Sequence, residues 1–284
     1  MSLDYVVCDV FTDRPFTGNQ LAVFTDAGDI ADDLLQALAR EINFSETTFI
    51  YPPDDPAVAD ARVRIFTPAA ELPFAGHPVL GTAVVLGERL GLTEVRLACG
   101  AGVVPVSITG RSGVMVQPVP TVAPVETAEL DALLAALGGV EPVIPVARYD
   151  NGVEHLVVVV GGAEEVGSVL GLVPNFGALA SAAGRSGTSV VAGSGRRWTS
   201  RAFAPGLGVN EDPATGSAAG PIAAHLCRYS LVPWGDEVEI HQGQAINRPS
   251  RLLAMAQGSD DGIERVEVGG DVVVVGSGSF DLSP

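Results

Sequence analysis

The chain has 284 residues, of which 47% are hydrophobic and 18% charged, so it can bury one large or two ordinary hydrophobic cores. Its formal net charge of -18 argues against nucleic acid or an anionic membrane as a partner, because both require clustered Arg or Lys. All 16 basic residues are Arg. Without Lys, the chain lacks the amine that Schiff-base chemistry and pyridoxal phosphate require, and it cannot form a P-loop.

Disulfides, secretion and membrane insertion are not expected. Cys8, Cys99 and Cys227 are far apart and odd in number, so they predict no disulfide framework. The first residues, MSLDYVVCDVF, lack the basic segment of a signal peptide, and no uninterrupted apolar run reaches about 18 residues. We therefore expect a cytoplasmic protein without a membrane span.

The first half of the chain is expected to open with a strand, YVVCDVF, followed by a helix over residues 31–42 with Asp29 as its cap. TTFIYP and ARVRIFTP are typical of strands that end at Pro. A second helix is expected to begin close to Gly76, with Pro78 in its first turn. The segments EVRLAC, GVVPVSIT and SGVMVQP are expected to be strands.

After a Pro-rich junction, QPVPTVAPVE, a similar order of elements is expected. Helices are predicted at ETAELDALLAAL and PNFGALASAAG and beyond Gly216; strands are predicted at HLVVVV, WTSRAFAP, DEVEIHQG, RLLAMAQ, RVEVGG and DVVVVGSGSF, with a hairpin turn at Gly269–Gly270. The fold class predicted is α+β, with two pseudo-symmetric domains from an internal duplication, each a mixed or antiparallel sheet around a central helix. The expected domains are 1–118 with the C-terminal strand 273–284, and 119–272.

One short phrase occurs in both halves. ELPFAGHP (71–78) and EDPATGSA (211–218) both read E-x-P-x-x-G, and RIFTP (64–68) and RAFAP (201–205) precede them. A helix N-terminus favours an anion, and Gly76 and Gly216 would let a ligand approach the backbone. One copy alone would be explained by a turn into a core helix. Two copies predict helix starts that converge on one cleft and bind a small carboxylate.

Two polar residues are candidates for proton transfer. Glu46 stands among Phe44, Phe49 and Ile50, so we expect burial to raise its pKa toward neutrality, although a solvent-facing strand residue would also fit. His77 follows Gly76, where a helix N-terminus favours the neutral imidazole; a helix-start residue bonded to the backbone is the alternative.

Substrate binding or a structural role is expected of the other polar residues in the two phrases. Asp212 would orient a substrate amine or hydroxyl, or hold His77, or only form the turn before Pro213. Gly216 and Ser217 are expected to contact a carboxylate. The Glu that begins each phrase is expected to pair with the Arg before it, Glu71 with Arg64 and Glu211 with Arg201.

No metal or other cofactor is expected. His155, His225 and His241 show no metal-ligand spacing and are interpreted as structural. The sequence also lacks a G-x-S-x-G nucleophile motif and a dinucleotide-binding fingerprint.

The chain resembles the PhzF (phenazine-biosynthesis protein) family, which has a diaminopimelate-epimerase-like fold. The strings DVFTDRPFTGNQLAVF, NFSETTF, RIFTPAAELPFAGHPVLGTA, RAFAPGLGVNEDPATGSAAGP and QGQAINRPSRL carry the resemblance over most of the chain. It implies that Glu46 shuttles a proton and that His77 contacts the substrate or relays the proton. Ser45 is a further expected substrate contact, and a homodimer is the expected assembly. Racemases of this fold place a Cys at each helix start, and His77 and Ser217 in those positions exclude a two-thiol mechanism.

The resemblance implies a cofactor-independent isomerase that moves a proton on a small carboxylate substrate. Glu46 would take the proton from one carbon and return it to another on the same face, and the family's named substrate is trans-2,3-dihydro-3-hydroxyanthranilate. Two alternatives stay open: a non-catalytic small-molecule binder that retains the cleft, and a lyase or hydratase that uses the same Glu. Exchange of solvent hydrogen into a bound ligand separates catalysis from binding.

Overall fold

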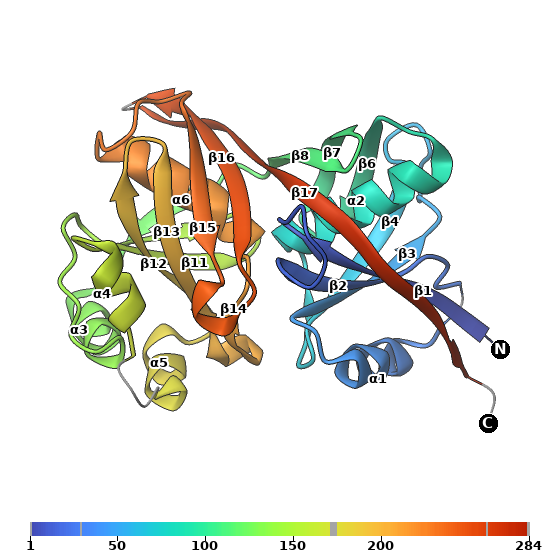
Figure 1. Cartoon of the computed structure of the whole chain (residues 1–284), viewed down its shortest axis with the longest axis horizontal. Helices are drawn as coiled ribbons and strands as arrows, with labels where there is room; N and C mark the ends of the chain where they lie inside the picture. The colour runs from blue at the N-terminus through green and yellow to red at the C-terminus, as the bar shows by residue number, and fades with distance from the viewer. Residues whose placement is uncertain (1, 29, 171–174, 260, 283–284) are drawn as a thin grey trace.

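The computed structural model describes residues 2–28, 30–170, 175–259 and 261–282. Asp29, Pro174 and residues 283–284, on which parts of the sequence predictions fall, lie outside these ranges. Figure 1 shows two lobes side by side, each with strands around one helix. Within the described ranges, none of the helices combines the length and the apolar character that crossing a membrane would require.

The first lobe contains the elements of the first half of the chain (Figure 1). Its strands are β1 (Ser2–Val10), β2 (Asn19–Phe24), β3 (Glu46–Tyr51), β4 (Ala61–Phe66), β5 (Glu71–Leu72), β6 (Glu94–Cys99), β7 (Gly102–Thr109) and β8 (Ser112–Gln117). Its helices are α1 (Asp32–Ile42) and α2 (Gly76–Leu90). Both helices lie where the sequence predicts them, and α2 begins at Gly76.

The second lobe contains most of the remaining elements. Its strands are β9 (Thr121–Pro124), β10 (Ala147–Asp150), β11 (Glu154–Val159), β12 (Gly187–Ser194), β13 (Arg197–Ala204), β14 (Val209–Asp212), β15 (Glu237–Gln242), β16 (Ser250–Ser259) and the start of β17 (Gly262–Asp281). Its helices are α3 (Thr127–Ala136), α4 (Ala163–Ser168), α5 (Phe176–Ala183) and α6 (Gly216–Arg228), with short 3-10 turns η1 (Pro205–Leu207) and η2 (Gln244–Ile246).

The sheet is mixed, as predicted. Most neighbouring strands are antiparallel, whereas β2 and β3, β4 and β6, β11 and β12, and β13 and β15 pair in parallel. The central helices α2 and α6 are buried over nearly their whole length, from Gly76 to Gly87 and from Gly216 to Cys227. A helix without a polar face is stable only inside a core, which explains why strands surround both helices.

The hairpin turn predicted at Gly269–Gly270 is wrong. β17 runs through both glycines without a turn: it pairs with β16 as far as Gly269 and with β1 from Val272 onward. A Cβ atom on Gly270 would lie 2.5 Å from the ring of Phe11, so this glycine makes room for an aromatic side chain. The expected return of the C-terminal segment to the first lobe is correct, because β17 crosses between the lobes and pairs with β1 (Figure 1).

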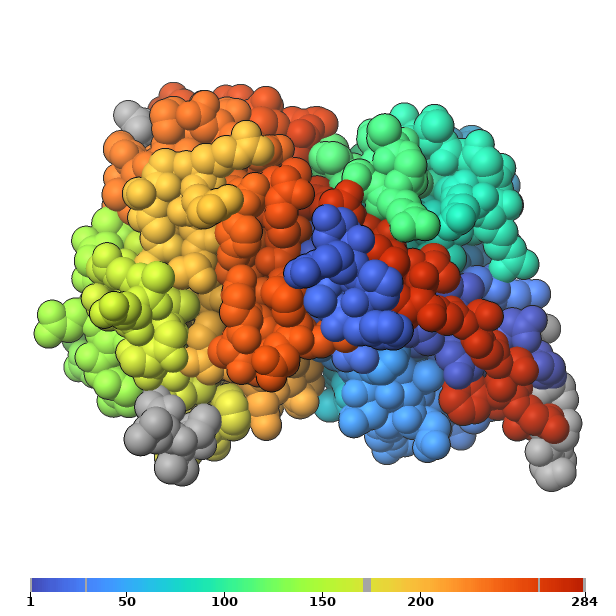
Figure 2. Space-filling view, in the orientation of Figure 1, coloured from blue at the N-terminus to red at the C-terminus, as the bar shows by residue number. Residues whose placement is uncertain are grey.

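The loop between β1 and β2 also joins the lobes. Arg248 of the second lobe donates from Nε to the carbonyl of Gly18 and from Nη2 to the carbonyl of Thr17, and it forms an ion pair with Asp9. Figure 2 shows this N-terminal segment, in blue, lying against the orange and red C-terminal strands. Together with β17, these contacts hold the two central helices in fixed relation.

Candidate active site

The N-termini of α2 and α6 meet backbone to backbone. A Cβ atom on Gly76 would lie 2.3 Å from both the carbonyl carbon of Gly216 and the amide nitrogen of Ser217. A Cβ atom on Gly216 would lie 2.9 Å from the amide nitrogen of His77. The two helix starts therefore converge, as the repeated phrase predicts, and they do so because neither glycine has a side chain.

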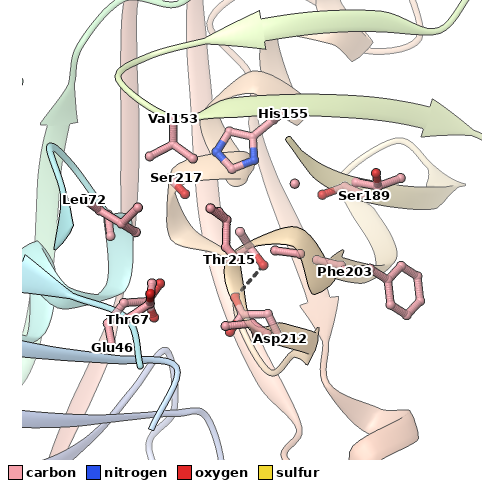
Figure 3. A pocket seen from close by; sticks show the side chains of 17 residues that line it. Glu46, Thr67, Leu72, Val153, His155, Ser189, Phe203, Asp212, Thr215 and Ser217 are labelled. Atoms are coloured by element: carbon pink, nitrogen blue, oxygen red, sulfur yellow. Dashed lines mark hydrogen bonds between the residues drawn. The ribbon is translucent and has the colours of Figure 1, made fainter. Parts of the chain in front are cut away.

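A pocket between the lobes lies beside this contact. Figure 3 shows Glu46, Thr67 and Leu72 on one side of it and Asp212, Thr215 and Phe203 on the other. Glu46, Asp212 and Ser217 are the expected site residues that line this pocket, whereas Ser45, Gly76, His77 and Gly216 do not line it. The complete lining is Glu46, Thr67, Leu72, Ala75, Val153, His155, Gly187, Thr188, Ser189, Ala202, Phe203, Ala204, Leu207, Val209, Asp212, Thr215 and Ser217.

Glu46 begins β3, and the Oε2 atom of its carboxyl group is buried. Its side chain is 14% exposed, and Oε2 has no hydrogen-bond partner in the described structure. Burial raises the pKa of Glu46 well above its ordinary value, and the charge of Asp212 raises it further. The expectation of a raised pKa is thus confirmed. A carboxyl that no donor stabilises as an anion is suited to accept a proton near neutral pH and release it again.

His77 faces Glu46 with one free ring nitrogen. Its Nε2 has no hydrogen-bond partner and lies 3.5 Å from Oε2 of Glu46. Burial lowers the pKa of His77 to about 3, against a hydrogen bond to the backbone of Gln20 that raises it. The ring is therefore neutral, as expected, with burial as the main cause. A neutral ring has one N–H and one lone pair, and Nε2 is the ring nitrogen that faces Glu46.

Asp212 ends β14 and accepts three side-chain hydrogen bonds. Oδ1 accepts from Asn19 Nδ2 at 2.8 Å and from Ser45 Oγ at 3.0 Å, and Oδ2 accepts from Thr215 Oγ1 at 2.6 Å. These bonds favour the ionised form, but burial is the larger effect and the pKa of Asp212 is raised. The three donors fix the orientation of this carboxyl at the pocket wall.

Asn19 is a member of the site that the sequence interpretation missed. Its Nδ2 lies 3.1 Å from His77 Nδ1 and also donates to the backbone carbonyl of Ala214 at 2.9 Å. Asn19 Nδ2 thus lies between Asp212 Oδ1 and His77 Nδ1, and within the described residues Asp212 and His77 form no direct hydrogen bond. The signal was available, because Asn19 lies in DVFTDRPFTGNQLAVF, one of the strings that carry the family resemblance.

The first turn of α6 is held in place by two buried amide side chains. Gln117 donates from Nε2 to the carbonyl of Gly216, and Asn151 donates from Nδ2 to the carbonyl of Ser217, both at 2.8 Å. The amide groups of Gly216 and Ser217 belong to the first turn, where a helix supplies no acceptor. They form the positive end of α6 beside the pocket, which suits a carboxylate.

His155 does not fit its interpretation as a structural residue. It lines the pocket, is 2% exposed, and neither ring nitrogen has a hydrogen-bond partner in the described structure. By contrast, His225 bonds Tyr149 and His241 bonds Glu239. In the part of the chain that the structure describes, no group of three or more His, Cys, Asp or Glu residues could hold a metal ion.

The sequence matches one protein family and several curated proteins. The family model described as "Phenazine biosynthesis-like protein" matches residues 8–278. Two curated relatives are each named trans-2,3-dihydro-3-hydroxyanthranilate isomerase. The one from Pseudomonas aeruginosa is 43% identical, over 94% of this chain and 95% of its own, and the one from Pseudomonas chlororaphis is 42% identical, over 98% and 99%.

A solved structure shows the same arrangement over the whole chain. It is titled as a predicted epimerase from Pseudomonas aeruginosa, and it is similar with a TM-score of 0.83 and 34% sequence identity. The match covers 99% of this chain and 100% of the solved one. The likeness in fold therefore extends over both lobes.

Proposed function

Since the chain belongs to the phenazine biosynthesis-like protein family, it is an isomerase of the PhzF type, and we propose that it shifts a proton on trans-2,3-dihydro-3-hydroxyanthranilate or a close relative. This substrate is taken from the names of the two Pseudomonas relatives. A non-catalytic binder and a lyase or hydratase are not favoured, because these relatives are isomerases over nearly the full length of the chain.

One observation supports the proposed mechanism: Glu46, whose carboxyl oxygen Oε2 is buried and has no hydrogen-bond partner among the described residues, lines the pocket beside the converging helix starts. Ionised Glu46 takes a proton from a ring carbon and becomes the neutral acid that its surroundings favour. The electron pair of the broken C–H bond delocalises through the conjugated ring toward the carboxylate. Glu46 then returns the proton to a second carbon, and because the base lies on one wall, both transfers occur on the same face of the ring.

The other site residues act by holding the substrate and the base. The amides of Gly216 and Ser217 stabilise the carboxylate as charge develops on it. Asp212, fixed by Ser45 and its other donors, binds the substrate's amino group. His77 offers Nε2 as an acceptor for the protonated form of Glu46, from which it lies only 3.5 Å away.

We also propose that the two lobes are duplicated domains, 1–118 with 273–284, and 119–272. Matched strand registers support this: β4 pairs Ile65 with Leu72, and β13 pairs Ala202 with Asp212, at corresponding places in the two phrases. The homodimer stays a prediction of the sequence.

A turnover assay tests the proposed function. The purified protein is incubated with trans-2,3-dihydro-3-hydroxyanthranilate, with a chelator and without added cofactor, and NMR follows the ring hydrogens. The expected product is an isomer of the same mass. A ligand that binds and stays unchanged would support the binder, and a product that differs in mass by one water would support the lyase or hydratase.

A further inference from the structure

The wall of the pocket opposite Glu46 carries a second group of buried polar side chains. His155 on β11 and Thr188 and Ser189 on β12 all line the pocket and are 2% exposed or less. Both ring nitrogens and both hydroxyls lack a hydrogen-bond partner in the described structure. Figure 3 shows His155 and Ser189 across the pocket from Glu46. Buried polar groups are normally paired, so several unpaired ones around one pocket indicate a ligand that completes them.

The strand registers show how this group relates to the base. In the first lobe, β2 and β3 pair Leu21 with Glu46, and in the second, β11 and β12 pair His155 with Gly187. In the first lobe the polar residue of this pair, Glu46, is on the second strand, β3, whereas in the second lobe the polar residue, His155, is on the first strand, β11. A Cβ atom on Gly187 would lie 2.9 Å from His155 Nδ1, so the glycine leaves the space that the imidazole occupies.

The chemistry of these side chains suits a neutral ligand group. Burial lowers the pKa of His155 to about 4, so near neutral pH the ring has one N–H donor and one lone pair. Successive residues of a strand point to opposite faces, and the pairing of His155 with Gly187 puts Ser189, not Thr188, on the face of His155. The Ser189 hydroxyl can donate and accept. Two uncharged groups of this kind match a hydroxyl, which also donates and accepts, better than they match a carboxylate or an ammonium group.

We propose that His155 and Ser189 form a subsite that binds the ring hydroxyl of the substrate and selects hydroxylated substrates over deoxy ones. The proposal rests on the proposed function, whose substrate carries a carboxyl, an amino and a hydroxyl group. The carboxyl lies at the helix starts and the amino group at Asp212. The hydroxyl is the remaining substituent, and it would bind at the wall opposite Glu46.

Calorimetry with two stable aromatic ligands, 3-hydroxyanthranilate and anthranilate, tests the subsite. We expect the protein to bind the hydroxylated ligand about tenfold more tightly, the size of one or two hydrogen bonds. His155→Phe keeps a ring but removes both nitrogens, and it should bring the ratio of the two affinities close to one. Ser189→Ala should reduce the ratio severalfold. Its matched control is Ser200→Ala, because Ser200 is equally buried with an unpartnered hydroxyl but does not line the pocket.

Ligand binding requires no turnover, so the outcome is independent of the isomerase assay. Wild-type ratios in both His155→Phe and Ser189→Ala, or no preference in the wild-type protein, would overturn the subsite. A loss of turnover in His155→Phe with an unchanged affinity ratio would overturn it as well. If His155→Phe does not fold, as circular dichroism would show, the comparison of Ser189→Ala with Ser200→Ala decides.

Discussion

The segments that contain the two repeated phrases, residues 64–78 and 201–218, share their scaffold and differ at the pocket. In each, an Arg forms a two-pronged pair with a Glu: Arg64 with Glu71 at 2.8 and 2.7 Å, and Arg201 with Glu211 at 2.9 and 2.7 Å. In each segment the guanidinium carbon of the Arg also lies 5.1 Å from the ring centre of the Phe two residues later in the chain. The predicted Arg–Glu pairs are confirmed in both segments.

The differences lie at the pocket and at the helix starts beside it. Leu72 in the first segment corresponds to Asp212 in the second, and both line the pocket. His77 corresponds to Ser217, and of these two only Ser217 lines the pocket. The comparison teaches that two similar backbone segments supply two helix starts, whereas their side chains differ. In the proposed mechanism, one lobe holds the base and the other binds the substrate.

The largest effect is expected where the two segments touch. Gly76→Ala places a methyl group 2.3 Å from the backbone of Gly216 and Ser217, which no side-chain movement relieves. We expect the free energy of unfolding to fall by about 3 kcal/mol or more. Denaturant unfolding measures it. Gly177→Ala in α5 is the control: among the described residues its Cβ meets one atom, at 3.6 Å, so it should stabilise the protein by about 0.5–1 kcal/mol. Similar effects of the two substitutions would refute the close contact.

The two Arg–Glu pairs are expected to differ in strength because their burial differs. Glu211 is 7% exposed, whereas Glu71 is 43% exposed. Glu211→Gln leaves the buried charge of Arg201 without its partner and should cost about 3 kcal/mol of unfolding free energy. Glu71→Gln should cost less than about 1 kcal/mol, since water screens the exposed pair. Thermal or denaturant unfolding of both variants checks this, and equal losses would show that burial does not distinguish the two segments.

The smallest effect is expected at Asp212, the residue of the second segment that corresponds to Leu72, and it concerns the pH dependence of catalysis. In the proposed mechanism ionised Glu46 is the active form, so kcat/KM should fall as the pH drops through its raised pKa, above the ordinary range of a Glu. The negative charge of Asp212 contributes to that raised pKa. Asp212→Asn removes the charge, so the acid limb of the profile should move to lower pH. Burial is the larger cause and persists, so the limb should stay above the ordinary range.

A pH–rate profile of each protein measures the shift. An acid limb that stays in place or moves to higher pH in Asp212→Asn would contradict the coupling between the two carboxyls.

Much of this arrangement could be predicted from the sequence, because local patterns determine it. The duplicated phrase indicated the helix starts at Gly76 and Gly216, and the apolar neighbours of Glu46 indicated a raised pKa. The turn at Gly269–Gly270 was predicted wrongly because a glycine pair signals a turn locally, whereas here Gly270 accommodates Phe11, which lies just after β1 and far away in the sequence. Asn19 and His155 were missed for the same reason, since only the strand pairing brings them to the site.

The central claim is that a single carboxyl, Glu46, moves the proton. Deuterium incorporation in heavy water tests it most directly, with NMR following both exchanging ring carbons in the wild-type protein and in Glu46→Gln. Because general acid–base catalysis by one group contributes about 10²–10⁴-fold, and one group serves both transfers here, the variant should lose at least that factor. It should still bind the ligand with similar strength. Deuterium incorporation at the wild-type rate in a folded Glu46→Gln variant would contradict the claim and leave His77 or Asp212 as the base.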